Sequence, residues 1–291
     1  MTTQPETASP YKFPPAIKAF SAWVRLVGLF SPATAARMTY KMWFRPGRSN
    51  LREGEAERLA QGRDEWMTVN RRRIALHIWG AGPPVLLVHG WASRSARLSS
   101  IAVAIAERGY QAVAFDAPAN GESEGTGTSA VEISGVIQAL ADKYGPFAVA
   151  VTHSFGGVAM AMALRNGLAL PRLVAISPPA DARRLMRVYL DAMQVNADIA
   201  GRVMQLSKEE FGEDIWDRLT MYHGPEDFQL PALIIHDRSD GVALFNEGEK
   251  VAQSWPHARM MATDNLGHKR ILLDRGVIAK VVAFIVAGKQ G

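Results

Sequence analysis

An uncharged stretch of chain, residues 147–164, constrains the fold more than any other part of the sequence. It begins as an apolar run with β-branched residues and ends as a run of helix-forming residues. A stretch of this length without Asp, Glu, Lys or Arg is long enough to span a membrane. The polar residues His153 and Ser154 and the pair Gly156 and Gly157 in its middle argue against a span. They indicate instead a strand that turns sharply into a helix.

The sharp turn predicts an exposed position for Ser154, in front of the N-terminus of the following helix. That setting is typical of a nucleophile elbow, whose usual pattern is G-x-S-x-G. Gly156 and Gly157 supply the small residues that the turn needs where the two backbones crowd, but Thr152 stands where Gly is usual. The alternative is a buried strand, a Gly-rich turn and a packed helix with a capping serine, and the stretch alone leaves it open.

Composition limits the other possibilities. The 291 residues suffice for one large α/β domain or two small ones. The chain has no cysteine, which excludes disulfides and a thiolate zinc site. Residues 1–10 lack the basic and apolar segments of a secretory signal, so we expect a cytoplasmic protein. The net charge of +5 is modest, and we expect no nucleic-acid partner.

The N-terminal region is basic and free of acidic residues between Glu6 and Glu53. Pro14 and Pro15 predict the start of a helix, and apolar residues recur at helical spacing from Ile17 to Phe30. Ser31 before a proline predicts the start of a second helix. Packing of these helices on the main domain is the simpler expectation. Peripheral contact with an anionic membrane is the alternative. The basic residues of the region include Lys12, Lys18, Arg25, Arg37, Lys41, Arg45 and Arg48.

The rest of the chain alternates between short apolar runs and amphipathic segments. This alternation predicts an α/β fold with a mainly parallel, doubly wound sheet. Two helical segments, 181–196 and 207–221, interrupt the pattern and predict a small helical lid at about residues 180–228. The expected strands are 65–69, 74–79, 85–88, 112–115, 147–151, 173–176, 232–235 and 259–262. The expected helices of the main domain are 95–108, 128–144, 158–164, 244–253 and 277–285.

Polar side chains gather where the expected strands end, which is where ligands bind in such sheets. Serine needs a base to take its proton, and the base is usually a histidine oriented by a carboxylate. Ser154, Asp240 and His268 are the candidates for these roles, and they follow one another along the chain in the order serine, carboxylate, histidine. Asp237 is a rival for the acid, and Asp181 is a more distant one.

Five motifs in this order resemble the α/β-hydrolase superfamily from about Trp66 to the C-terminus. The resemblance implies a sheet of the α/β-hydrolase type within residues 63–291, with residues 1–62 as a separate basic helical region. It also implies a nucleophile Ser154, a base His268, an orienting Asp240 and an oxyanion hole formed by the backbone N–H groups of Trp91 and Phe155. The motifs are Val85–Trp91, Phe115–Ser123, Thr152–Gly157, Leu233–Asp240 and Asn265–His268.

The remaining polar residues have simpler expected roles. His153 should point away from the nucleophile and pack, and His89 and His236 should be hydrogen-bonded structural residues. A zinc site from these histidines and Asp237 lacks a metal-binding spacing. Asp116 is expected to fix the loop that follows its strand. Arg94 follows the oxyanion loop, and exposure to solvent is a simpler expectation for it than contact with an anionic substrate.

The resemblance implies a serine hydrolase that needs no cofactor and acts on a small-molecule carboxylic ester. Thioesters, lactones, amides and peroxy-acid chemistry would use the same groups. An epoxide or haloalkane hydrolase would need a carboxylate at the position of Ser154. A non-catalytic relative that binds a ligand or a partner is the alternative from another class, since Thr152 and Ala119 depart from the family's glycines.

Overall fold

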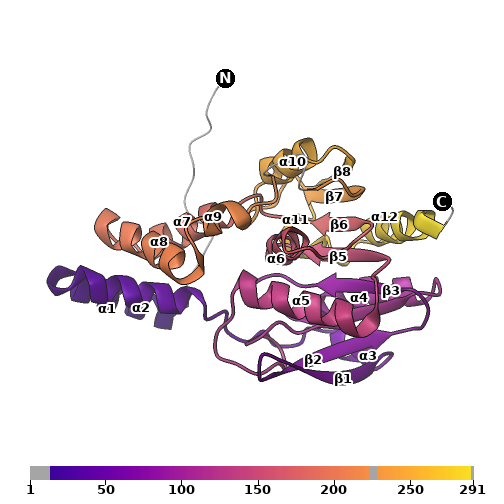
Figure 1. The fold of residues 1–291 in the computed structure, drawn as a ribbon, viewed down its shortest axis with the longest axis horizontal. Helices are drawn as coiled ribbons and strands as arrows, with labels where there is room; N and C mark the ends of the chain where they lie inside the picture. Colours follow the sequence, from indigo (N-terminus) through magenta and orange to yellow (C-terminus); the bar gives the residue numbers. More distant parts are fainter. Residues whose placement is uncertain (1–13, 223–227, 290–291) are drawn as a thin grey trace. The chain divides into compact units, whose positions relative to one another are not determined.

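A computed structural model describes residues 14–222 and 228–289 of the chain. The first residues, with Lys12, and residues 223–227 of the expected lid lie outside this part. The chain divides into two compact units (Figure 1). The helical unit combines the described residues up to Phe44 with Asp181–Asp217, and the α/β unit contains Arg45–Ala180 and the residues from Arg218 onward. No described helix is long and apolar enough to cross a membrane.

The α/β unit contains an eight-stranded sheet in the order β1-β2-β4-β3-β5-β6-β7-β8. Strands β3 to β8 run parallel to one another, and β2 pairs antiparallel with both of its neighbours, β1 and β4. This arrangement confirms the predicted α/β-hydrolase type of sheet. The strands are β1 (Arg63–Val69), β2 (Arg72–Trp79), β3 (Pro84–Val88), β4 (Gln111–Phe115), β5 (Val149–His153), β6 (Leu173–Ile176), β7 (Ala232–Asp237) and β8 (Ala258–Thr263).

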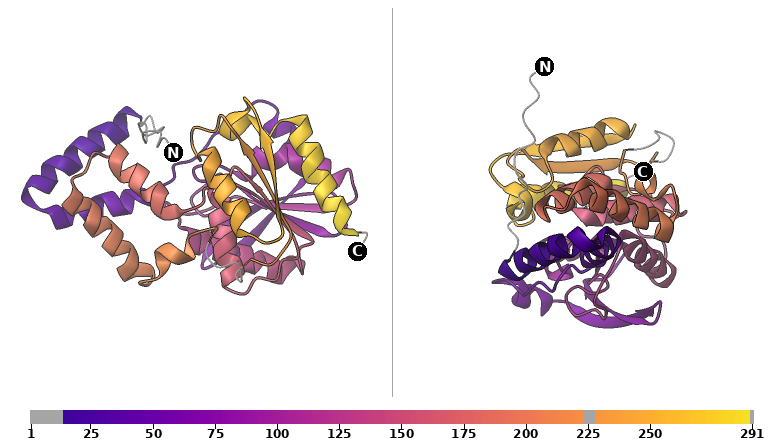
Figure 2. Two further views of the ribbon diagram at one scale, coloured as in Figure 1. Left: turned by 90° about the horizontal axis from the view of Figure 1, so that it is seen from above. Right: turned by 90° about the vertical axis from the view of Figure 1, so that its left-hand side faces the viewer.

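The two faces of the sheet carry different helices (Figure 2). Side chains from alternate positions of the central strands, such as Val151 and Ile235, form one buried cluster with α4 and α12. Their neighbours in sequence point to the other face, where Thr152 approaches α6 and His236 approaches α10. The helices of this unit are α3 (Glu55–Leu59), η1 (Ser95–Leu98), α4 (Ser99–Ala106), α5 (Ala130–Tyr144), α6 (Phe155–Arg165), α10 (Phe245–Ser254), α11 (Gly267–Arg270), α12 (Arg275–Val286) and η2 (Ala287–Lys289).

The order of the strands in the sheet determines where the candidate site lies. Strand β3 lies between β4 and β5, so the connections that leave β3 and β5 diverge at their carboxyl ends. Ligands of open parallel sheets bind in the crevice at such a reversal. Ser154 directly follows β5 and the His89–Trp91 segment directly follows β3, so both begin at this point.

The helical unit joins the N-terminal helices to the insertion after β6. Its helices are α1 (Pro15–Phe30), α2 (Pro32–Trp43), α7 (Ala182–Ala192), α8 (Ala197–Phe211) and α9 (Ile215–Arg218, which ends one residue beyond the unit). The Ser21 hydroxyl donates to the Met193 carbonyl oxygen, and the Tyr40 hydroxyl donates to Glu210 at 2.8 Å. A Cβ added at Gly28 would lie 2.7 Å from Ile199. The N-terminal helices therefore pack on the insertion helices.

The second insertion helix differs from the sequence expectation. It begins at Ala197, where the Asn196 side chain accepts from the Ile199 N–H, and ends before Gly212 at a φ of 104°. The expected range 207–221 is therefore wrong, because the cap at Asn196 and the glycine that ends the helix were not recognised as its boundaries. The structure does not test whether the insertion acts as a lid.

Candidate active site

Ser154 occupies a strained turn between β5 and α6. Its backbone has φ 53° and ψ −129°, a conformation that non-glycine residues adopt at a cost of about 1–3 kcal/mol. The Ser154 N–H donates to the carbonyl oxygen of Ile176 at 2.9 Å, which anchors the turn to β6. A Cβ at Gly156 would lie 2.6 Å from the carbonyl oxygen of Val88, so only glycine permits this approach of helix and strand. The geometry is that of the predicted nucleophile elbow.

Thr152 fits at the position where the motif usually has glycine. Its side chain is fully buried, and its hydroxyl donates to the carbonyl oxygen of Val174 at 3.4 Å. A Cβ at Gly157 would approach the Thr152 oxygen to 3.5 Å and the Met221 sulfur to 2.8 Å. The contact with Thr152 would be an ordinary van der Waals one, so the close approach that needs a glycine here is the one to Met221.

The segment after β3 lies against the elbow. A Cβ at Gly90 would lie 2.9 Å from the Ser154 Cβ, and the rings of Trp91 and Phe155 pack edge to face with centroids 5.1 Å apart. The Phe155 N–H is also among the first N–H groups of α6, which the helix cannot satisfy by itself. The structure thus brings the two candidate oxyanion residues together beside the candidate nucleophile.

The side chains of Asp240 and His268 are hydrogen-bonded to each other. The His268 Nδ1–H donates to Asp240 Oδ2 at 2.7 Å, and the other carboxylate oxygen accepts from the N–H groups of Val242 and Ala243. Burial by itself would raise the pKa of Asp240, but hydrogen bonds from His236 and His268 hold this pKa well below its usual range. The carboxylate therefore stays charged at neutral pH. It fixes the tautomer of His268 that carries its proton on Nδ1, so Nε2 is the acceptor nitrogen of this ring.

The rival acid, Asp237, has another set of partners. Its Oδ2 accepts from the Thr263 hydroxyl at 2.7 Å and from the Leu266 N–H at 3.0 Å, and its Oδ1 accepts from the Ser239 N–H. These bonds brace the two loops that carry Asp240 and His268. Asp237 therefore supports the site without contacting the histidine side chain.

His153 contacts the loop that carries His268, and the sequence did not predict this contact. Its Nε2–H donates to the backbone carbonyl oxygen of His268 at 2.9 Å, and the two ring centroids lie 4.8 Å apart. The side chain is buried, and burial together with the nearby His268 lowers the pKa of His153 to about 3. His153 is neutral at physiological pH, and its position before the nucleophile couples the elbow to His268.

His89 and His236 are hydrogen-bonded and buried, as expected. His89 Nε2 accepts from the Ala117 N–H at 2.9 Å and its Nδ1–H donates to the Gly90 carbonyl oxygen, so this ring shapes the loop that follows β3. The His236 Nε2–H donates to the Ala243 carbonyl oxygen at 2.9 Å. Within residues 14–222 and 228–289, no group of three or more His, Asp or Glu side chains could hold a metal ion.

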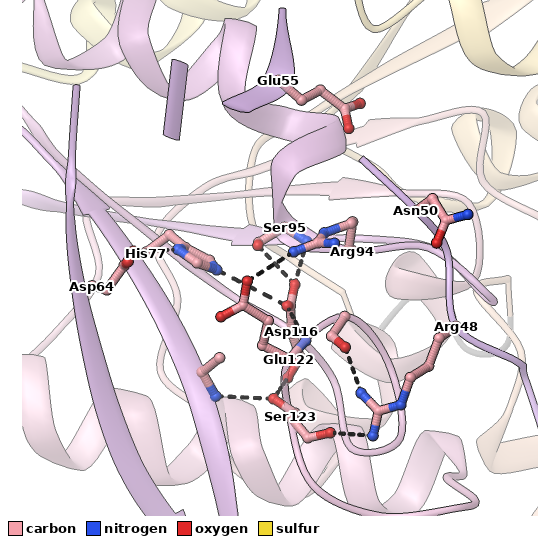
Figure 3. Close-up of polar contacts among 12 residues, drawn as sticks. Arg48, Asn50, Glu55, Asp64, His77, Arg94, Ser95, Asp116, Glu122 and Ser123 are labelled. Atoms are coloured by element: carbon pink, nitrogen blue, oxygen red, sulfur yellow. Dashed lines mark hydrogen bonds and ion pairs between the residues drawn. The ribbon is translucent and has the colours of Figure 1, made fainter. Parts of the chain in front are cut away.

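Asp116 organises a buried polar cluster between the segments that follow β3 and β4 (Figure 3). Its carboxylate accepts from the backbone N–H and hydroxyl of Ser95, both at 2.7 Å, and from the Glu122 N–H at 2.8 Å. A Cβ at Gly121 would lie 1.8 Å from Asp116 Oδ2. Ala119 takes the place of a family glycine at a φ of 63°. Asp116 thus fixes the loop after β4, as the sequence predicts.

Arg94 is buried, although the sequence favours exposure to solvent for it. Its side chain is only 8% exposed, and it pairs with Glu122 at 3.3 Å. Arg48, in the segment that follows α2, donates to the carbonyl oxygens of Gly121 and Ser123 in the same cluster (Figure 3). The sequence could not reveal this burial, because the partners of Arg94 come from distant positions in the chain.

The fold and this cluster of side chains define an α/β-hydrolase architecture with a serine on its elbow. The model of the alpha/beta hydrolase family matches residues 85–281, and the chain belongs to this family. No curated protein matches the chain.

Solved structures share the fold. An esterase of Pyrococcus furiosus is 19% identical, with a TM-score of 0.60 over 83% of this chain and 98% of its own. An esterase of Exiguobacterium antarcticum is 17% identical, with a TM-score of 0.59 over 77% and 100%. Est1E of Butyrivibrio proteoclasticus, solved with ferulic acid bound, is 14% identical, with a TM-score of 0.61 over 78% and 100%. At these identities the likeness concerns the fold alone.

Proposed function

We propose that the protein is a serine hydrolase that cleaves a small-molecule carboxylic ester through an acyl-enzyme. The observation that carries the proposal is the hydrogen bond of 2.7 Å between His268 and Asp240. It lies at the same edge of the sheet as Ser154, which occupies a strained turn. Such a constellation activates a serine hydroxyl for attack on an acyl carbonyl. Two solved structures with this fold are esterases, which favours an ester among the acyl substrates.

In the proposed reaction, His268 Nε2 takes the proton of Ser154 as its oxygen attacks the ester carbonyl. Asp240 stabilises the imidazolium that forms, and the N–H groups of Trp91 and Phe155 hold the oxyanion. The imidazolium then returns its proton to the departing alcohol. His268 next activates a water molecule, which releases the acid and restores Ser154. No cofactor takes part in these steps.

The candidate nucleophile Ser154 and the candidate base His268 are not hydrogen-bonded to each other in this structure. Within its described residues, no hydrogen bond joins the Ser154 hydroxyl to His268. Catalytic hydrogen bonds are often long in free enzymes and tighten when substrate binds. The proposal therefore places the closing of this bond in the substrate complex.

Turnover of p-nitrophenyl esters of graded acyl length tests the proposal and finds the preferred acyl group. Ser154→Ala and His268→Ala should each lower turnover by roughly 10⁴-fold or more, because triad members act as a unit. Trp91→Phe keeps the backbone N–H and should keep most of the turnover, whereas Trp91→Pro should cost about 10²- to 10³-fold. A folded wild-type protein that hydrolyses no acyl substrate would favour the non-catalytic alternative.

A further inference from the structure

Helix α1 leaves a row of large apolar side chains in solvent. Its other side packs within the helical unit and buries Ser21, Val24 and Gly28. At 100° per residue, the exposed positions share about a third of the helix circumference. We call them the α1 apolar stripe, and their exposed fractions are 55% for Trp23, 48% for Leu26, 78% for Leu29 and 84% for Phe30.

The helix that carries the α1 apolar stripe and its neighbour α2 have charges of one sign. No acidic residue occurs between Glu6 and Glu53, so neither α1 nor α2 contains one. Lys18 on α1 is exposed, as are Arg37 and Lys41, which lie one turn apart on α2. The acidic residues described in the helical unit, such as Asp191 and Asp198, belong to the insertion after β6. An apolar stripe on a helix pair with exposed cationic and no anionic residues fits a partner that is apolar inside and negatively charged on its surface.

We propose that the α1 apolar stripe docks the protein on an anionic lipid membrane, with the helix lying in the plane of the interface. Helices that bind in this way combine a strong apolar face containing Trp, Phe and Leu with Lys or Arg on the polar side. The helix spans only 16 residues, and no described helix is long and apolar enough to cross a membrane. This surface function is independent of the proposed ester hydrolysis.

A second copy of the chain fits this surface less well. A symmetric dimer through the α1 apolar stripe would bring identical patches together. It would therefore place Lys18, Arg37 and Lys41 of both copies near one another without an acidic partner from either α1 or α2. Negatively charged lipid headgroups would compensate the same residues. The charge pattern thus favours lipid over self-association.

Sedimentation of the full-length protein with vesicles tests the proposal. The vesicles contain phosphatidylcholine alone or a mixture with phosphatidylglycerol, each at low and high salt. The wild-type protein should bind the mixed vesicles and lose binding as salt rises. Trp23→Ser combined with Phe30→Ser should weaken partitioning by more than about 10-fold, since two large apolar side chains lose their insertion. Lys18→Gln with Arg37→Gln and Lys41→Gln should weaken it by about fivefold per charge.

The matched control combines Trp66→Ser with Leu273→Ser, which are exposed apolar residues of the α/β unit. It should bind vesicles as the wild type does, and all variants should keep the wild-type circular dichroism spectrum. Absence of vesicle binding, or equal loss in the control, would overturn the proposal. So would a wild-type dimer that the Trp23 and Phe30 changes convert to monomer, because the stripe would then cover a second copy. A marked fall in melting temperature in that variant would show that the stripe is buried inside the folded chain, and would also contradict it.

Discussion

His153 Nε2–H donates to the backbone carbonyl oxygen of His268 at 2.9 Å, while the side chain of His268 is bonded to Asp240. His153 ends β5 and immediately precedes Ser154. The bond therefore links the strand that carries the candidate nucleophile to the loop that carries the candidate base. Displacement of the His268 loop would change the distance between the two reacting side chains even if neither were altered.

Replacement of His153 tests this link. His153→Phe retains a ring of similar size but removes the donor, so we expect kcat to fall about 10-fold because the base is held less accurately. KM should change little, since His153 is buried below the site. His153→Gln can still donate a hydrogen bond and should recover part of the lost kcat. Equal losses in both variants would argue for a packing role only.

The two aspartates of the β7 loop should differ in their effects. Asp240→Asn should lower kcat by about 10⁴-fold, because an amide favours the wrong tautomer of His268. Asp237→Asn keeps an acceptor for Thr263 and Leu266, so we expect less than about a 10-fold loss of kcat and a destabilisation of about 1–2 kcal/mol. Steady-state kinetics and urea unfolding of both variants make the comparison. An inactive Asp237→Asn beside an active Asp240→Asn would assign the acid to Asp237.

The glycine after the elbow gives a steric prediction. In Gly156→Ala the new methyl would lie 2.6 Å from a backbone oxygen, so α6 must move away from β3. We expect a destabilisation of about 3 kcal/mol or more and little remaining turnover. Gly135→Ala on α5 is the matched control, because its Cβ meets only Asn70 Nδ2 at 3.9 Å. That change should stabilise the helix by about 0.5–1 kcal/mol, and similar effects of the two changes would contradict the predicted crowding at the elbow.

Acid should destabilise the protein through His153. Burial, with the adjacent His268, lowers the pKa of His153 to about 3, whereas an unfolded histidine titrates near 6.5. The unfolded chain binds a proton in this window that the folded chain does not, so stability falls as pH drops. The slope is about 1.4 kcal/mol per pH unit for one site. Of the charges around His153, Asp240 opposes the lowering of its pKa and His89 adds to it.

Unfolding by urea at a series of pH values checks this prediction. His153→Gln should flatten the loss of unfolding free energy between about pH 6 and pH 4. His77→Gln is the control, because Asp116 and Asp64 outweigh the effect of burial and raise the pKa of His77. The contribution of His77 is present below pH 6.5 and is lost as pH rises, so its removal should leave the slope on the acid side unchanged. A wild-type slope in His153→Gln would contradict the assignment.

Local sequence patterns predict much of this fold. The apolar run 112–115 falls within β4, and the cap at Ser31 begins α2, because each depends on neighbouring residues alone. The expected strands 65–69 and 74–79 fall within β1 and β2, and the hairpin that joins them turns at Asn70 and Arg71, which both adopt positive φ. The order of the strands was not predictable, since it depends on pairings between distant parts of the chain.

Long-range contacts explain what the sequence missed. Arg94 was expected in solvent, but Glu122 and the segment around Ser49 cover it, and those residues lie 28 and 45 positions away. The packing partner of α1 was equally unpredictable from the sequence. The Ser21 hydroxyl donates to the carbonyl oxygen of Met193, which lies 172 positions later in the chain. At the site, the motifs placed Asp240 and His268 in one loop cluster, whereas the bond from His153 to the His268 backbone leaves no pattern in sequence.

Labelling with a fluorophosphonate probe tests the central claim most directly, because the probe reacts with an activated serine and leaves an inert one unmodified. Peptide mapping by mass spectrometry then locates the adduct. The account predicts one adduct on Ser154, no labelling of Ser154→Ala, and labelling that is slowed by at least about 10³-fold in His268→Ala. Unlabelled Ser154 in a protein that turns over esters, or undiminished labelling of Ser154→Ala, would contradict it.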